Sequence, residues 1–162
     1  MQTDLVPDIL IEGLIFPESP RWHDHQFYFS DMNDGKVICA DLSGNIRTLI
    51  DMPGPCSGLG WRPDGTLLVV SMLDRCLMSW DGTQLHLVCD VYDLATYHCN
   101  DMVVDAQGRA YIGNFGFDLN SGQPLKTAEI IMVTPDGSAR VVADGLRFPN
   151  GTVITPDQQT LI

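Results

Sequence analysis

One motif occurs four times along the chain, and this repetition limits the possible folds more than any other feature. Each copy reads as a strand, a tight turn that contains Asp, and a second strand. The residue that anchors the first strand is Trp22, Trp61, Val104 or Ile154, and successive anchors lie 39, 43 and 50 residues apart. This period is close to the roughly 40 to 50 residues of a four-stranded β-propeller blade.

A second hairpin lies between successive copies of the motif, so each repeat contains four strands. Helical periodicity is nearly absent, and the apolar runs are short and rich in Val, Ile, Leu and aromatic residues. A β-sandwich would use similar strands but would not need this period. We therefore predict an all-β propeller, with second hairpins at residues 37–49, 77–88 and 130–142.

The two ends of the chain also follow the repeat. Residues 9–18 resemble residues 141–150, so they are predicted to form an outermost strand, which in a closed ring would complete the last blade. The sequence stops at Thr160–Ile162, inside the second strand of the fourth copy. We expect one partial propeller domain over residues 1–162, with about three to three and a half blades and the later blades missing.

Four equivalent positions in the repeat carry polar side chains that could meet. The residue four positions before each anchor is Glu18, Ser57, Asn100 or Asn150. Equivalent positions at the start of innermost strands converge on a propeller axis. A carboxylate, two amides and a hydroxyl supply the oxygen donors that Ca²⁺, Mg²⁺ or Mn²⁺ prefers. The alternative is that these side chains satisfy backbone groups of turns.

Charge and composition exclude several classes of partner. The formal net charge of −12 disfavours binding to nucleic acid or to an anionic membrane. No apolar stretch approaches the roughly 20 residues of a membrane helix, and no signal peptide is indicated, so we expect a soluble, cytoplasmic protein. The five cysteines contain no C-x-x-C pair and are interpreted as buried free thiols.

Three motifs in order resemble the regucalcin and gluconolactonase family, which includes senescence marker protein and the luciferin-regenerating enzyme. They are Phe16–Trp22, Cys99–Arg109, and Phe148–Gly151 followed by Thr155–Asp157. The likeness runs from about Ile11 to the end of the chain. It implies a six-bladed propeller that holds one divalent cation (calcium, zinc, magnesium or manganese) on its axis and hydrolyses sugar or related lactones.

The resemblance also implies roles for individual residues. Glu18 and Asn150 match metal ligands of the family, and Asn100 matches the Asn that sits beside the metal and contacts substrate, so all three are assigned to the metal site. His98 stands where some members place a substrate-binding Arg, and we assign His98 and Asn100 to substrate binding. A further Asp ligand, which the family also uses as proton acceptor, comes from a later blade and has no counterpart here.

The expected chemistry needs no protein nucleophile. An axial cation would polarise the lactone carbonyl and lower the pKa of a bound water. Cys56–Gly60 lacks the G-x-S-x-G pattern of a serine hydrolase. Two alternatives stay open: hydrolysis of phosphotriesters or aryl esters at the same site, and a non-catalytic calcium-binding or scaffold propeller.

Four further features bear on the site or on packing, and the first two have two interpretations each. Asp101 either orients Asn100 or caps a turn. The segment Gly113–Lys126 is either a lid over the axial opening or a surface insertion. Trp22 and Trp61 are predicted to pack between blades, and three histidines are predicted to lie on the surface: His23, His25 and His86.

Overall fold

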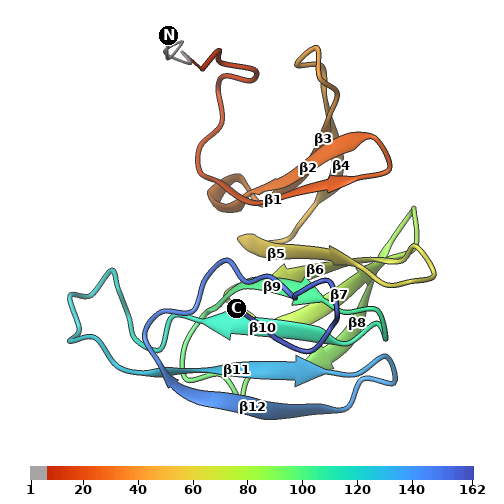
Figure 1. The fold of residues 1–162 in the computed structure, drawn as a ribbon. Helices are drawn as coiled ribbons and strands as arrows, with labels where there is room; N and C mark the ends of the chain where they lie inside the picture. The colour runs from red at the N-terminus through yellow and green to blue at the C-terminus, as the bar shows by residue number, and fades with distance from the viewer. Residues whose placement is uncertain (1–6) are drawn as a thin grey trace, which may run out of the picture.

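The computed structural model describes residues 7–162, which form three four-stranded antiparallel sheets (Figure 1). The first sheet contains β1 (Pro17–His23), β2 (Gln26–Asp31), β3 (Lys36–Ala40) and β4 (Ile46–Asp51). The second contains β5 (Cys56–Trp61), β6 (Leu67–Ser71), β7 (Cys76–Trp80) and β8 (Leu85–Asp90). The third contains β9 (Cys99–Val104), β10 (Ala110–Asn114), β11 (Ala128–Val133) and β12 (Ala139–Leu146).

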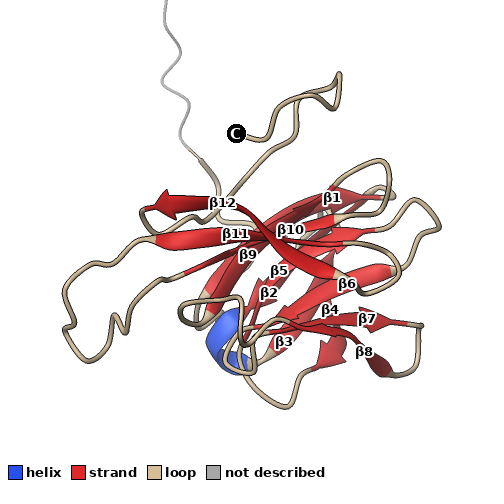
Figure 2. Cartoon of the chain, turned by 90° about the horizontal axis from the view of Figure 1, so that it is seen from below, coloured by secondary structure: helices blue, strands red, loops and turns tan. Residues whose placement is uncertain are grey.

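Each sheet keeps its strands in sequence order, as a propeller blade does, and the first strands of the three blades lie together. β5 contacts both β1 and β9. The one helical turn drawn in Figure 2 is η1 (Met32–Asp34), between β2 and β3. The prediction of an all-β chain built from propeller blades is confirmed.

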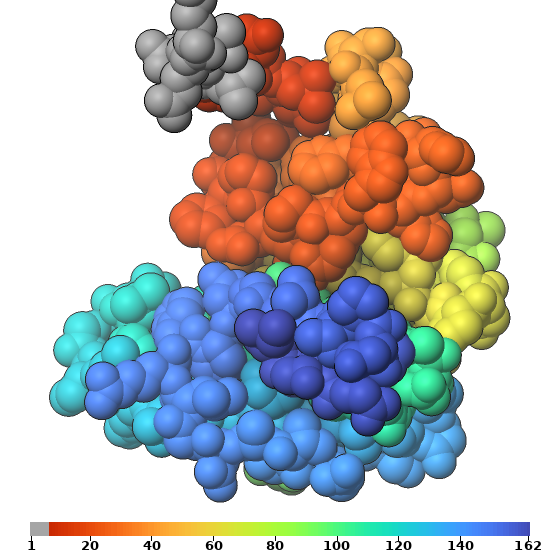
Figure 3. Space-filling view, in the orientation of Figure 1, coloured from red at the N-terminus to blue at the C-terminus, as the bar shows by residue number. Residues whose placement is uncertain are grey.

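The fourth copy of the motif forms less structure than the first three. Ile154 and Leu161 make an isolated antiparallel bridge in place of two full strands. Figure 3 shows this last segment, in dark blue, lying against the third blade. The backbone N–H of Ala106 donates to the Gln158 side chain at 3.1 Å, which fixes the segment there.

The predicted outermost strand over residues 9–18 is wrong as far as Phe16. Residues 7–16 carry no strand, and β1 begins at Pro17. A strand needs a hydrogen-bonded neighbour, and the Asp31 carboxylate instead accepts the backbone N–H groups of Ile15 at 2.9 Å and Phe16 at 2.7 Å. Asp31 therefore takes the last two donors of the segment, and none of the three described sheets pairs with the residues before them.

Two buried clusters lie between the blades. One joins the second and third blades and includes Leu68, Met102 and Ile112. The other joins the first and second blades, and Trp61 packs against it as predicted. Trp22 is 55% exposed, contrary to the prediction, because the described blades cover one side of the first blade and leave the other open.

All five cysteines are free, as predicted. Cys39, Cys56 and Cys99 are buried, whereas Cys76 and Cys89 are half-buried. Burial raises the pKa of the Cys56 and Cys99 thiols to about 12, so both stay protonated at neutral pH. Within residues 7–162 no helix is long and apolar enough to span a membrane.

Candidate metal and substrate site

A cavity of about 550 Å³ opens where β1 and β9 begin, and three of the four equivalent repeat positions line it. Glu18 comes from β1, Asn100 from β9, and Asn150 from the segment after β12. These residues are far apart in sequence, and the blade arrangement brings them to one place. The expected convergence is thus correct for Glu18, Asn100 and Asn150.

Ser57, at the fourth equivalent position, does not line this cavity. Its side chain is fully buried, and its Oγ has no hydrogen-bond partner in the described part of the chain. Its backbone carbonyl instead accepts the Ser30 hydroxyl at 2.9 Å. Ser57 therefore contributes to the contact between β2 and β5, and its predicted place at the axial site is wrong.

Strand pairing is irregular at the equivalent positions of all three blades. The pairing of β1 shifts between Glu18 and Arg21, and Ser19 has a positive φ of 52°. The pairing of β5 shifts between Cys56 and Leu59, and the β9–β10 register shifts in the same part of the third blade. Bulges re-aim side chains and often lie beside functional sites. The sequence repeat gave no sign of them.

Among the described residues on the cavity wall, Glu18 alone carries an acidic group. Its pKa lies above the usual range, chiefly because burial disfavours the charge and secondly because the Asp101 carboxylate repels it. A hydrogen bond from the Ser19 backbone acts in the opposite direction. A bound cation would remove this penalty, since it would compensate the buried negative charge.

Asn100 is held in a defined orientation. Its side chain is 2% exposed, and its Nδ2 donates to the Pro149 carbonyl at 3.1 Å. No described residue donates to its Oδ1, so this oxygen is the atom left to face the cavity. Gly113 permits the arrangement, because a Cβ there would lie 2.5 Å from the Pro149 oxygen. Both contacts hold the Pro149 carbonyl, and Asn150 is the next residue in the chain. They therefore place Asn150 at the cavity.

Asp101 has a different role from the two that the sequence suggested. Its Oδ1 accepts the Ser19 hydroxyl at 2.7 Å, an Arg21 guanidinium N–H at 2.6 Å and its neighbour's backbone N–H. Arg21 also donates to the carbonyls of Leu59 at 3.0 Å and Met102 at 2.6 Å. The pair of Arg21 and Asp101, which we call the axial brace, joins β1, β5 and β9 beside the cavity. The sequence did not predict it, because its two members are about 80 residues apart.

His98 lines the cavity within an aromatic wall. Its ring stacks on Tyr97 at 4.0 Å, and Phe115 and Phe148 lie 4.6 Å apart on the same wall. Burial, followed by the charge of Arg75, lowers the pKa of His98, although Asp118 opposes this effect. The ring is therefore neutral at neutral pH and can both donate and accept a hydrogen bond.

The segment predicted as a lid or an insertion borders the cavity. Residues 115–127 connect β10 to β11, and Phe115, Leu119 and Asn120 from this connection line the cavity. The other three histidines lie elsewhere: His23 stacks on Trp61, His25 lies in an exposed turn, and His86 pairs with Asp81.

The donor set fits an oxygen-preferring cation. Across residues 7–162, no three His, Cys, Asp or Glu side chains converge to hold a metal ion. A cation in this cavity would depend on the Glu18 carboxylate and the amide oxygens of Asn100 and Asn150. Carboxylate and amide oxygens suit Ca²⁺, Mg²⁺ or Mn²⁺, with water completing the coordination.

Three blades around a shared cavity define a β-propeller, with a carboxylate and two amides at the place where the innermost strands begin. Residues 16–162 match the model of the SMP-30/gluconolactonase/LRE-like region, and the chain belongs to this family. No match was found among curated proteins.

Solved structures of related proteins have the same fold. A gluconolactonase from Xanthomonas campestris is 25% identical, with a TM-score of 0.79, and the match covers 94% of this chain and 55% of that one. A luciferin-regenerating enzyme is 16% identical, with a TM-score of 0.71 and coverage of 90% and 51%. A calcium-binding regucalcin from Agrobacterium tumefaciens is 15% identical, with a TM-score of 0.56 and coverage of 79% and 44%. The chain thus spans about half the length of these proteins.

Proposed function

We propose that the cavity holds one divalent cation and a small lactone, and that the complete propeller hydrolyses the lactone. The observation that carries this proposal is the meeting of Glu18, Asn100 and Asn150 around one cavity. Family membership and the likeness to a gluconolactonase support lactones as the substrate class. The proposal concerns the whole propeller, because this chain spans about half of its structural relatives.

The cation would be held by Glu18, Asn150 and the free Oδ1 of Asn100. When bound, it would supply Lewis-acid chemistry for an ester carbonyl. Asn100 cannot turn its amide nitrogen toward the substrate without losing the bond to Pro149. Its oxygen is therefore directed into the site by a backbone contact, a preorganised arrangement that costs little on binding.

The substrate-binding side of the cavity has both polar and apolar surfaces. Neutral His98 can hydrogen-bond a hydroxyl or ring oxygen of a lactone without a charge. Phe115 and Phe148 would cover the carbon skeleton and exclude water. The Asp expected as further ligand and proton acceptor is not among these residues, so a calcium-binding propeller without turnover is the second candidate function.

Metal binding tests the first part of the proposal on this chain directly. Titration with Ca²⁺ or Mn²⁺ in a calorimeter should give one site, and Glu18→Gln and Asn150→Ala should each weaken it at least about tenfold. Glu12→Gln and Asn45→Ala are the matched controls, because both side chains are exposed. Unchanged binding in either site variant would refute the assignment.

Turnover and the coding sequence separate the candidate functions. Reading the coding sequence beyond Ile162 should reveal further repeats, with an Asp four residues before the next anchor. The protein that it encodes should hydrolyse a sugar lactone faster than an aryl ester or a phosphotriester, and Glu18→Gln should abolish this activity. Metal binding with no hydrolysis of any of the three substrates would favour the calcium-binding alternative.

A further inference from the structure

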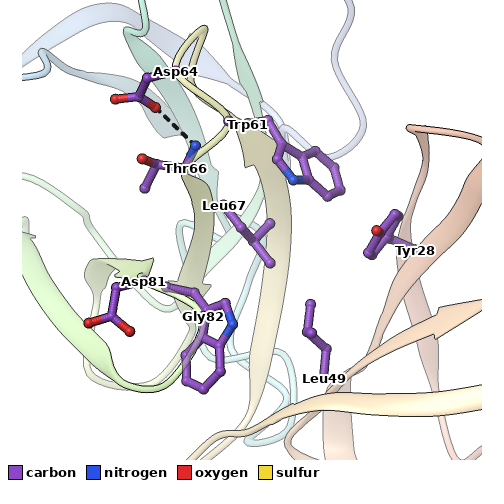
Figure 4. Close-up of a pocket in the computed structure, with 10 residues that line it drawn as sticks. Tyr28, Leu49, Trp61, Asp64, Thr66, Leu67, Asp81 and Gly82 are labelled. Carbon is purple, nitrogen blue, oxygen red and sulfur yellow. Dashed lines mark hydrogen bonds between the residues drawn. The ribbon is translucent and has the colours of Figure 1, made fainter.

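A second cavity, of about 370 Å³, lies between the first and second blades (Figure 4). It is at the opposite end of the second blade from the proposed metal site, where β5 ends at Trp61 and β7 ends at Trp80. The first blade contributes Tyr28, which lies across from Trp61 in the figure. This aromatic cavity is formed entirely by two blades of the chain and does not depend on the proposed function.

Aromatic side chains form much of its wall. Trp61 and Tyr28 meet edge to face, with ring centroids 4.9 Å apart. His23 stacks in parallel on Trp61 at 4.1 Å, which fixes the orientation of the indole. Trp80 also lines the cavity, and buried Leu67 lines it from β6, the strand between β5 and β7. The cavity therefore presents oriented aromatic rings beside the apolar side chains of Leu49 and Leu67.

Two carboxylates from neighbouring turns complete the lining. Asp64 accepts the backbone N–H of Thr66 at 2.9 Å, and Asp81 accepts the backbone N–H groups of Thr83 and Gln84 at 2.8 Å. Hydrogen bonds hold the pKa of both carboxyls below the usual range, through the Thr66 backbone for Asp64 and chiefly through His86 for Asp81. Both are ionised at neutral pH.

Among the described residues that line the cavity, none is basic, and the Asp64 carboxylate has no ion-pair partner in the described part of the chain. Arg47 lies near enough to Tyr28 to lower its pKa, in opposition to the larger effect of burial, but it is not part of the lining. His86 contacts Asp81 from outside the cavity at 2.6 Å. The lining thus combines negative charge with aromatic rings, and the net charge of −12 adds a favourable field for a cation.

We propose that the aromatic cavity binds a small organic cation, in particular an alkylated ammonium group. The faces and edges of Trp61, Trp80 and Tyr28 suit the cation's apolar shell, and the Asp64 and Asp81 carboxylates suit its charge. A bare metal ion would gain little from the indoles. An anion would be repelled by both carboxylates.

Choline and its uncharged isostere 3,3-dimethylbutan-1-ol test the proposal, because they have nearly the same shape and differ in charge. The chain has three tryptophans, so three indole N–H signals report binding by NMR. Choline should shift the signals of Trp61 and Trp80 and leave that of Trp22 in place. We expect a dissociation constant on the order of 1 mM and at least about fivefold weaker binding of the alcohol. Equal binding of the two compounds would overturn the proposal.

Variants identify the groups responsible. Asp64→Asn combined with Asp81→Asn should weaken choline binding at least about fivefold. Asp136→Asn should not weaken it, because Asp136 lies in the β11–β12 turn of the third blade, which corresponds to the turn of Asp81 in the second. Both substituted side chains are exposed, so the fold should persist. Trp80→Leu should also reduce binding. Choline binding unchanged in the double variant, or a trimethyllysine peptide binding more than about tenfold tighter than choline, would contradict a small-molecule cation site.

Discussion

The two interfaces between blades are packed in different ways. Between the second and third blades, Gly58 and Gly60 on β5 allow direct contact with Met102 and Val104 on β9. Between the first and second blades, large side chains meet instead, and the cavity beside Trp61 remains. Small residues let two strands approach closely, whereas the large side chains at the other interface leave an unfilled space beside Trp61. The difference separates a close-packed interface from one with space for binding.

The largest expected effect comes from the axial brace, which crosses both interfaces. Asp101→Ala should lower the free energy of unfolding by about 3 kcal/mol, because it removes the carboxylate that pairs with the Arg21 guanidinium and accepts the Ser19 hydroxyl. This figure is at the low end for a broken buried pair, since the Arg21 side chain is 23% exposed. Urea denaturation measures it, with exposed Asp51→Ala as control. A loss below about 1 kcal/mol would mean that the brace is not structural.

A smaller loss of stability is expected when a side chain is added at Gly58 on β5. In Gly58→Ala the new Cβ would lie 2.7 Å from the backbone nitrogen of Met102, and we expect a destabilisation of about 2 kcal/mol by overpacking. Gly54→Ala is the matched control, because a Cβ there meets nothing within 4 Å. Equal unfolding midpoints for the two variants would show that β5 and β9 are not in close contact.

The smallest expected effect is electrostatic. Asp101→Asn removes a negative charge near Glu18 and should lower the Glu18 pKa, although burial would still keep it above the usual range. A raised carboxyl pKa stabilises the fold at low pH and loses that contribution as the pH rises through the folded pKa. Protons also compete with the cation, so metal affinity should fall as the pH drops through the same range.

NMR titration of the Glu18 carboxyl measures this change in the wild type and in Asp101→Asn. Glu12, which is exposed, serves as the internal reference. A Glu18 pKa that rises in the variant would contradict the assigned repulsion.

Local patterns in the sequence predicted most of the fold. The repeat period and the Asp-containing turns located the hairpins, and the position four residues before each anchor identified Glu18, Asn100 and Asn150. The strand predicted over residues 9–16 does not form, because its expected partner, the last blade, is not among the three described sheets, and the Asp31 side chain accepts the N–H groups of Ile15 and Phe16. Whether a segment finds a strand partner depends on tertiary contacts, which the periodicity of the sequence does not report.

The rest of the site depends on contacts between blades. The brace between Arg21 and Asp101 links positions about 80 residues apart. The irregular pairing near Glu18, Ser57 and Asn100 also arises between strands, and residue type and spacing do not report it. The aromatic cavity likewise needs Tyr28 from one blade and Trp61 from the next.

Three segments of this chain are proposed to form one cation site. Crystals of the protein grown with Mn²⁺ test it most directly, through the anomalous scattering of the metal. We predict one strong peak in the 550 Å³ cavity, at coordination distance from oxygens of Glu18 and Asn150 and beside Asn100. No peak there at saturating Mn²⁺, or a peak whose ligands exclude Glu18, would contradict the account.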